Sequence, residues 1–153
     1  MRAKGLETKC YLCGCEVEEI LEAAHLWGIA EIKNSDAPKL NNVLNKECMS
    51  DLIEDCDHTN ELFYKKYVLA NSGDNGVWLC NNHHELFDRK YYCFDSEFGK
   101  VIIKKDDSEI IKNYLLLSEP NCSIASIMTE KTKVFLGERE SIFKNVVSEY
   151  ETL

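Results

Sequence analysis

The sequence predicts an α+β domain held together by a zinc ion. Two pairs of candidate metal ligands, Cys10-x-x-Cys13 and Cys80-x-x-His83, have the spacing of the two arms of a tetrahedral zinc site. Around these arms, short apolar runs bounded by turn residues alternate with segments of helical periodicity. The arms are far apart in the chain, so a shared ion would join two distant segments of one small fold. The predicted ligands of this structural zinc are Cys10, Cys13, Cys80 and His83.

The densest cluster of candidate ligands follows the turn signal Asn75-Gly76. The apolar run 77–79 predicts a short strand, and the spacing of apolar side chains from His83 onward predicts a short helix packed on that strand. On such a helix His84 and Asp88 lie four residues apart and share one face. This pair is therefore a candidate for half of a second cation site.

These segments together resemble the HNH endonucleases of the ββα-metal class. The resemblance rests on Cys-x-x-Cys at 10–13, Ala-Ala-His at 23–25 and Asn-Gly-x-x-Leu-Cys-x-x-His-His-x-x-Phe-Asp-Arg at 75–89. It covers roughly residues 8–95, and it implies a single HNH nuclease domain over 1–153. Within that domain it implies a core of residues 8–31 and 72–95, a helical insertion in the hairpin at 32–71, and a C-terminal scaffold of a β-hairpin plus helices at 96–153.

The resemblance also implies metal-dependent hydrolysis of DNA phosphodiester bonds. The three residues that give the family its name correspond to His25, Asn75 and His84. His25 would be the general base that takes a proton from water, and Asn75 would orient its imidazole and stabilise the hairpin. His84 and Asp88 would hold one hydrated Mg²⁺ or Mn²⁺ ion.

The chain departs from the family pattern at one metal-ligand position. Many family members carry Asp or His immediately before the first-motif histidine, but Ala24 stands there in this sequence. Two protein ligands then remain for the ion, with water and phosphate oxygens completing its coordination. Glu22 is a candidate remote substitute, and Arg89 is a candidate contact to a substrate phosphate.

The segment 16–27 carries conflicting signals. Its composition favours a helix, whereas the family implies that residues 21–26 form the first strand of the hairpin. We adopt the strand, because the zinc arms and the first-motif histidine must converge on the second strand.

In the insertion, we expect a loop at 34–39 and two short helices at 40–53 and 60–70. The second of these helices carries an apolar stripe of Leu62, Phe63, Tyr67 and Val68. We interpret this stripe as core packing rather than as a DNA-facing surface.

The C-terminal third contains no cluster of candidate catalytic residues, so we expect it to be scaffold. Alternating residues predict a β-hairpin, and the remaining segments predict helices, a loop and one short strand. In order, the expected elements are hairpin strands at 91–94 and 100–104, a helix at 108–117, a loop around Pro120 at 118–123, a short strand at 133–136 and an amphipathic helix at 138–150.

The composition fits a small cytoplasmic protein. A chain of 153 residues with 44% apolar content suits one globular domain. No apolar run approaches the roughly 18 to 20 residues that cross a bilayer, and nothing resembles a signal peptide. Eight cysteines could indicate a secreted disulfide framework, but their paired spacing favours metal binding in a reducing compartment.

Several cysteines and one histidine lie outside the two zinc arms: Cys15, Cys48, Cys56, Cys93 and His58. The simpler interpretation is that these are buried thiols and a surface imidazole. The alternative is that Cys48, Cys56 and His58 hold a second metal ion.

The charge balance is acidic, which is unusual for a protein that binds DNA. Eighteen basic and 27 acidic residues give a net charge of -9, whereas nucleic-acid binders commonly carry a basic footprint. We therefore expect DNA binding to involve a homo-oligomer, an additional DNA-binding domain or a protein partner. The leading function is DNA cleavage, with restriction or phage defence as a candidate setting. The alternative is a catalytically inactive, zinc-stabilised module that binds DNA or protein.

Overall fold

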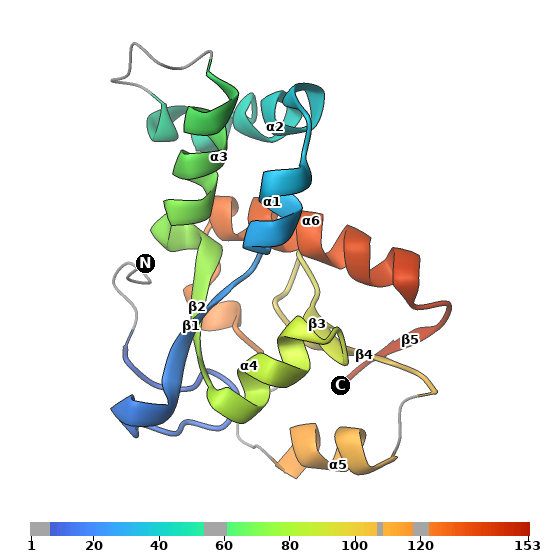
Figure 1. The fold of residues 1–153 in the computed structure, drawn as a ribbon. Coiled ribbons are helices and arrows are strands. Elements are labelled where there is room, and N and C mark those ends of the chain that lie inside the picture. The colour runs from blue at the N-terminus through green and yellow to red at the C-terminus, as the bar shows by residue number, and fades with distance from the viewer. Residues whose placement is uncertain (1–6, 54–60, 107–108, 118–122) are drawn as a thin grey trace.

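Two small antiparallel sheets organise the described part of the chain, which in this computed structural model comprises residues 7–53, 61–106, 109–117 and 123–153. Helices surround both sheets, and this mixture of helix and sheet confirms the predicted α+β class. The insertion helices α1, α2 and α3 gather at one end of the molecule and α5 lies at the opposite end, with α4 and α6 between them (Figure 1).

The first sheet is a hairpin that carries the candidate catalytic residues. It pairs β1 (Leu21–His25) with β2 (Gly76–Cys80), and the register sets Leu21 opposite Cys80 and His25 opposite Gly76. Helix α4 (Asn81–Asp88) follows β2 directly and contacts both strands. The result is a ββα unit, and it confirms the strand rather than the helix in segment 16–27. Pairing with β2 therefore outweighs the helical propensity of the glutamate-rich segment.

The chain between the two strands is helical, as predicted, but its boundaries differ from the prediction. It forms α1 (Ile29–Asn34), α2 (Ala37–Leu44), the 3-10 helix η2 (Glu47–Leu52), α3 (Leu62–Asn71) and the 3-10 helix η3 (Gly73–Asn75).

The loop expected at 34–39 was wrong, because α2 already begins at Ala37. The carboxylate of Asp36 caps this helix by accepting a hydrogen bond from the backbone N–H of Lys39 at 2.9 Å. Pro38 lies in the first turn, where its missing N–H leaves no intrahelical bond unmade. A capping signal was therefore present in the sequence.

The expected core packing of the α3 stripe was also wrong. The side chains of Leu62, Phe63 and Tyr67 are 42%, 79% and 56% exposed, whereas Val68 is half-buried. The helix is anchored instead by Leu69, which is fully buried. The physical reason is its position: α3 contacts α1, α2 and η3 at one end of the molecule, so only one side of the helix faces the protein (Figure 1).

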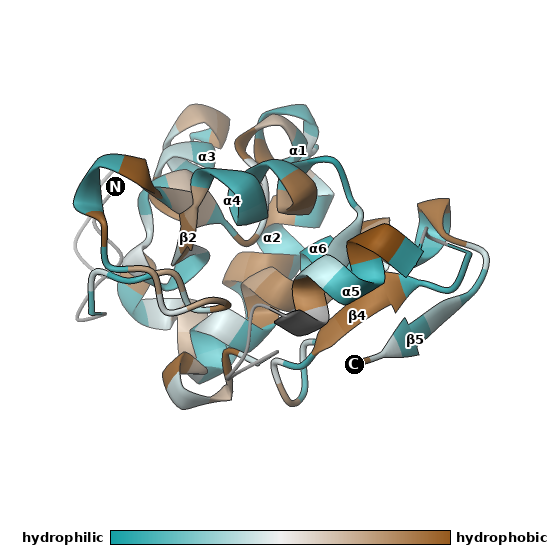
Figure 2. Ribbon diagram, turned by 90° about the horizontal axis from the view of Figure 1, so that it is seen from below, coloured by the Kyte–Doolittle hydropathy of each residue, from teal (hydrophilic) through white to brown (hydrophobic). Residues whose placement is uncertain are grey.

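The second sheet has the strand order β3-β4-β5, and all three of its strands come from the chain after α4. Strands β3 (Tyr92–Phe94) and β4 (Val101–Lys104) form the predicted hairpin, and β5 (Tyr150–Thr152) adds an edge. Strand β4 is strongly apolar, whereas β5 is largely hydrophilic, as expected of a strand exposed at a sheet edge (Figure 2).

Two helices complete this region. Helix α5 (Glu109–Leu117) agrees with the predicted helix at 108–117, and the loop predicted around Pro120 lies mostly outside the described residues. Helix α6 (Glu130–Val146) replaces the short strand predicted at 133–136 and begins earlier than the helix predicted at 138–150. The hydroxyl of Thr129 caps α6 by accepting from the N–H of Thr132 at 3.0 Å.

The α6 prediction failed because a short apolar run has no unique period. The buried residues Phe135, Leu136, Arg139 and Phe143 follow one helical stripe once the whole segment is considered. One core cluster includes residues of the hairpin unit, the insertion and the C-terminal region. Among the described helices, none combines the length and apolar character that crossing a bilayer demands.

Candidate functional site

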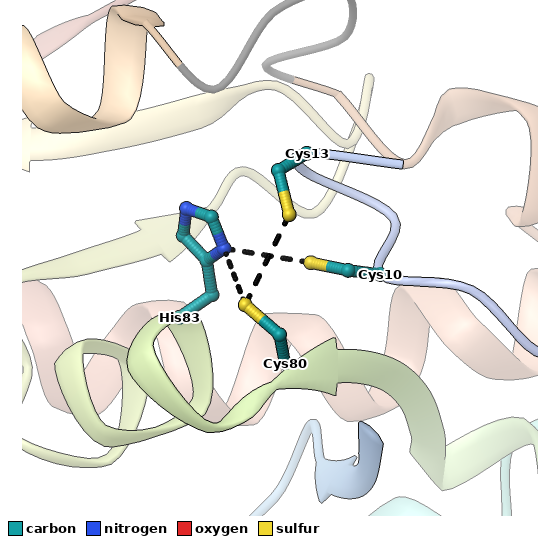
Figure 3. Close-up of side chains that lie close together, drawn as sticks. All are labelled: Cys10, Cys13, Cys80 and His83. Carbon is teal, nitrogen blue, oxygen red and sulfur yellow. Dashed lines mark hydrogen bonds between the residues drawn. The ribbon is translucent and has the colours of Figure 1, made fainter. Parts of the chain in front are cut away.

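The four predicted zinc ligands meet at one point between the N-terminal segment and the start of α4 (Figure 3). The sulfurs of Cys13 and Cys80 are 3.9 Å apart, and Nδ1 of His83 lies 3.4 Å from the sulfur of Cys10 and 3.1 Å from that of Cys80. All four ligand atoms lie within 4.8 Å of one another.

This spacing fits a zinc ion. Zinc bonds sulfur at about 2.3 Å and imidazole nitrogen at about 2.0 Å, so a tetrahedral ion separates its ligand atoms by roughly 3.5 to 3.8 Å. The measured separations of 3.1 to 3.9 Å bracket that range. The Cys3His set, with His83 offering Nδ1, could therefore hold a zinc ion.

The chain turns around this point through a tight loop. The N–H of Gly14 donates to the carbonyl of Cys10 at 2.8 Å, and the N–H of Cys10 donates to the carbonyl of Cys15 at 2.8 Å. Gly14 has φ +69°, a conformation that glycine adopts without steric cost. The glycine that follows the Cys-x-x-Cys pair therefore closes the turn that places both thiols on one side.

The surroundings of the three thiols shift their pKa values in different directions. Burial raises the pKa of the Cys13 thiol to about 12 and raises the pKa of Cys80. Burial acts in the same direction on Cys10, but hydrogen bonds from His83 and from backbone amides lower its pKa to about 6. A divalent cation would stabilise all three sulfurs as thiolates, which is the state that binds zinc.

A separate cleft of about 400 Å³ brings together the candidate catalytic residues. It is lined by His25 from the end of β1, by His84 and Asp88 from α4, and by Arg139 from α6. The antiparallel hairpin and the helix that follows it therefore place the first and last motifs of the sequence at one cleft.

His25 is half-buried, and the backbone of Ala70 in α3 is close enough to its imidazole to affect the pKa of the ring. Burial lowers the pKa of His25, and this effect exceeds the opposing effects of the Ala70 backbone and of the Asp88 charge. The neutral imidazole, which can accept a proton, is therefore the form favoured at neutral pH.

Asn75 is fully buried but does not play the predicted orienting role. Its Oδ1 accepts from the N–H of Trp27 at 2.7 Å, and its Nδ2 donates to the carbonyls of Trp27 at 3.1 Å and Leu69 at 3.2 Å. Both amide hydrogens are thus used on backbone groups rather than on the His25 imidazole. Asn75 joins the residues after β1 to the end of α3, so the hairpin-stabilising part of its prediction agrees with the structure.

The imidazole of His84 lies between two carboxylates. Its Nε2 is 3.2 Å from Oδ2 of Asp88, as expected for residues one helical turn apart, and its Nδ1 is 2.5 Å from Oε2 of Glu22. Hydrogen bonding to Asp88 raises the pKa of His84, and the same bond lowers the pKa of Asp88. Nε2 of His84 and the Asp88 carboxylate face each other and could share one divalent ion, whereas Glu22 lies on the opposite side of the ring.

Arg139 is a site residue that the sequence analysis missed. It is only 7% exposed, and its Nη2 donates to the carbonyl of Phe87 at 2.5 Å and lies 3.6 Å from Oδ1 of Asp88. Its Nη1 donates to the carbonyl of His25 at 3.4 Å, and its guanidinium carbon lies 3.7 Å from the centre of the Phe87 ring. One side chain of α6 therefore contacts both β1 and α4. The available signal was an arginine at an apolar position of the α6 stripe.

Those of the remaining candidates that the structure describes are not brought into either site. Arg89 forms an exposed ion pair with Glu85 at 2.5 Å and is not among the residues that line the cleft. Cys93 is buried in a small cluster with apolar side chains, and Cys15 and Cys48 are half-buried beside the core. Cys56 and His58 lie outside the described residues.

The chain matches the model of a known protein family. The model of a family described as HNH endonuclease matches residues 10–95, which is more than half of the 153-residue chain. The matched segment contains both zinc arms, the β1–β2 hairpin and α4, so the resemblance drawn from the motifs is confirmed. Searches of curated proteins and of solved structures gave no match.

Proposed function

The chain belongs to the HNH endonuclease family, and from this premise we propose that it is a metal-dependent endonuclease that hydrolyses DNA phosphodiester bonds. Membership of the family implies a nucleic-acid substrate. The observation that carries the proposal is that His25 and the His84–Asp88 pair, which are far apart in the chain, line the same cleft. A water molecule and a phosphate placed in that cleft would meet a proton acceptor and a cation site together.

His25 is the proposed general base. Phosphodiester hydrolysis requires a proton to leave the attacking water, and a positioned neutral imidazole accepts such a proton near neutral pH. The lowered pKa of His25, caused by its burial, supports this role because it keeps the ring neutral.

His84 and Asp88 are the proposed protein ligands of the catalytic ion. A bound Mg²⁺ or Mn²⁺ ion would supply stabilisation of the negative charge that develops on the phosphate and the leaving oxygen. Glu22 accepts a hydrogen bond from Nδ1 of His84, an arrangement that orients a ligand histidine and makes it a better electron donor. This contact supports Glu22 as a positioning residue. It would compensate in part for the Asp or His that many family members carry where this chain has Ala24.

Arg139 is the proposed positioning residue for the two halves of the cleft. Its hydrogen bonds to the carbonyls of His25 and Phe87 hold the end of β1 at a fixed distance from the end of α4. Its charge also lowers the pKa of Asp88, after the larger effect of the His84 hydrogen bond. An ionised Asp88 is the form that binds a divalent ion.

The zinc quartet has a structural role in this proposal. It joins the N-terminal segment to the junction of β2 and α4, directly before His84. All four of its donors come from the protein, and closed sites of this kind are typical of structural zinc. The whole described chain is proposed to act as one nuclease domain, since a single core cluster spans the matched segment and the C-terminal region.

A plasmid-nicking assay tests the proposed activity. The wild-type protein with Mg²⁺ or Mn²⁺ should convert supercoiled plasmid to nicked or linear forms, and a chelator added before the metal should prevent this. Linear duplex and single-stranded DNA should be tested in parallel. Failure to cut every DNA form with every divalent ion, by protein that retains its zinc, would favour the inactive binding module instead.

A further inference from the structure

A second cleft, also of about 400 Å³, opens beside the catalytic cleft between α1 and α3. His25 and Ile29 line both clefts, so the two lie side by side. We propose that this second cleft, here called the α1–α3 cleft, binds an unpaired, single-stranded segment of the nucleic acid next to the bond that is cut. The proposal rests on the nuclease function proposed above and specifies the substrate form.

Two exposed aromatic side chains line the α1–α3 cleft. Phe63 is 79% exposed and Tyr67 is 56% exposed, although an aromatic ring exposed to this extent loses the free energy of burial. They lie four residues apart on α3, which corresponds to about 6 Å along the helix axis. Both rings therefore lie on one side of the helix, where flat apolar ligands can stack on them.

The spacing of these rings favours unpaired bases over a duplex. Neighbouring bases in a DNA duplex are about 3.4 Å apart along the axis and have their faces covered by stacking. A single strand can open its stack and place separate bases on aromatic rings about 6 Å apart, which is how many single-strand binders work. A duplex would present phosphates and groove edges, which gain little from Phe63.

The charge at the cleft is complementary to phosphate. Lys33 on α1 and Lys66 on α3 line it, and the ammonium group of Lys66 donates to the backbone carbonyl of Lys33. No carboxylate is among the described residues that line this cleft, although acidic residues outnumber basic ones by 27 to 18 in the chain. The cleft is therefore a local exception to the acidic character of the protein, and it combines two cations with two rings.

The position of His25 in the lining of both clefts indicates where the strand would run. A strand whose bases stack on Phe63 and Tyr67 would have its backbone beside Lys33 and Lys66 and would pass from there to His25. A protein partner bound in the α1–α3 cleft would explain the exposed rings. It would not explain why the cleft also contains His25, the proposed general base. The combination of rings, cations and the shared histidine thus favours nucleic acid as the occupant.

Binding measurements without cleavage test this inference separately from the nuclease function. Fluorescence anisotropy would compare the affinity for a labelled single-stranded oligonucleotide with the affinity for the same sequence as a duplex. A chelator would remove free metal and so prevent cleavage, under conditions in which the protein retains its zinc. The variants are Phe63→Ala, Tyr67→Ala and the double variant. The matched control is Phe98→Ala, which removes an aromatic ring that is 58% exposed on the β3–β4 turn. Thermal melts would verify that each variant is folded.

We expect the wild type to bind the single strand more tightly than the duplex. Each ring deletion should weaken single-strand binding by about five- to a hundredfold, the range expected for loss of one base–aromatic stack. Lys33→Gln and Lys66→Gln should reduce the salt dependence of binding. Lys100→Gln should not, because Lys100 directly precedes β4 in the second sheet and does not line the α1–α3 cleft. Duplex binding should change little in the ring variants.

Three results would overturn the inference. The first is that deleting both rings changes nothing: the wild type and the double ring variant have equal single-strand affinity, which includes the case in which neither zinc-loaded protein binds measurably. The second is an equal loss of affinity in Phe98→Ala. The third is a wild-type oligomer, seen by light scattering, that the ring deletions convert to monomers, since the rings would then belong to an interface between copies. Plasmid nicking by the wild type would stand unaffected in each case.

Discussion

The guanidinium of Arg139 lies 3.6 Å from the carboxylate of Asp88, so a residue of the C-terminal helix contacts a candidate metal ligand in the ββα unit. The same guanidinium donates to the carbonyls of Phe87 and His25. Arg139 lies outside the segment 10–95 that matches the HNH endonuclease family. In this protein, therefore, the C-terminal region contributes to the candidate catalytic cleft as well as to the core.

Removal of Arg139 should affect both stability and metal binding. Arg139→Gln removes the charged donor that bonds the carbonyls of His25 and Phe87, which should lower the free energy of unfolding by about 3 kcal/mol. Well below the melting temperature, it should also raise the Mn²⁺ concentration needed for half-maximal cleavage, because the ends of β1 and α4 lose the side chain that positions them. Arg89→Gln, which removes an exposed arginine at the C-cap of α4, is the matched control for stability. A loss of stability without any shift in the Mn²⁺ requirement would assign Arg139 to the core alone.

Substitution of His25 should abolish most of the activity. His25→Ala removes the proposed proton acceptor, so the cleavage rate should fall by about a hundredfold to ten-thousandfold, the usual contribution of a general base. Circular dichroism should show that the variant is folded, and metal analysis should show that it retains zinc. Added imidazole should restore part of the rate if the cavity admits it. Equal cleavage by the variant and the wild type would remove His25 from the mechanism.

The pH dependence of cleavage should report the neutral form of His25. Burial lowers the pKa of this histidine, and only the unprotonated ring accepts a proton. The value of kcat/KM should therefore rise with pH and level off, with a midpoint below the ordinary histidine value of about 6.5. The measurement needs saturating metal, because the raised pKa of His84 lets protons compete with the ion for that ligand. A midpoint clearly above neutrality would contradict the assignment.

Glu22 should influence the catalytic ion through His84. Glu22→Gln keeps the size of the side chain but removes the charge that faces Nδ1, so metal affinity should fall by about 10- to 100-fold. Cleavage should recover at high Mn²⁺ concentration. The control is Glu19→Gln, in the exposed 3-10 turn before β1. An unchanged metal requirement in Glu22→Gln would show that the contact with His84 has no part in ion binding.

Loss of zinc should unfold the domain. Structural zinc sites contribute about 10 to 16 kcal/mol in small zinc domains, which is comparable to the whole stability of a typical domain. Cys80→Ser should therefore lower the melting temperature strongly and abolish zinc binding, whereas Cys48→Ser, outside the quartet, should do neither. Metal analysis and thermal melts check both. A wild-type melting curve that stays the same after verified zinc loss would exclude the structural role.

The sequence predicted the parts of this protein that depend on local spacing. Cysteines and histidines three residues apart bring their side chains to one ion, and His84 and Asp88 share a helix face, because covalent geometry and helical period fix these distances. The hairpin at 91–104 and the helical character of the insertion followed from the same local rules. The family motif added the pairing of β1 with β2, against the helical composition of the first strand.

Only the tertiary structure decided which distant groups meet. Asn75 bonds the backbone of Trp27 and Leu69, Glu22 reaches His84, and Arg139 spans both sides of the cleft. The exposure of Phe63 was likewise set by where α3 lies, not by its apolar sequence. Such contacts depend on how several elements pack at once, and each element alone is compatible with many packings. Local chemistry thus specified the ligand sets, and long-range packing specified the surroundings in which they act.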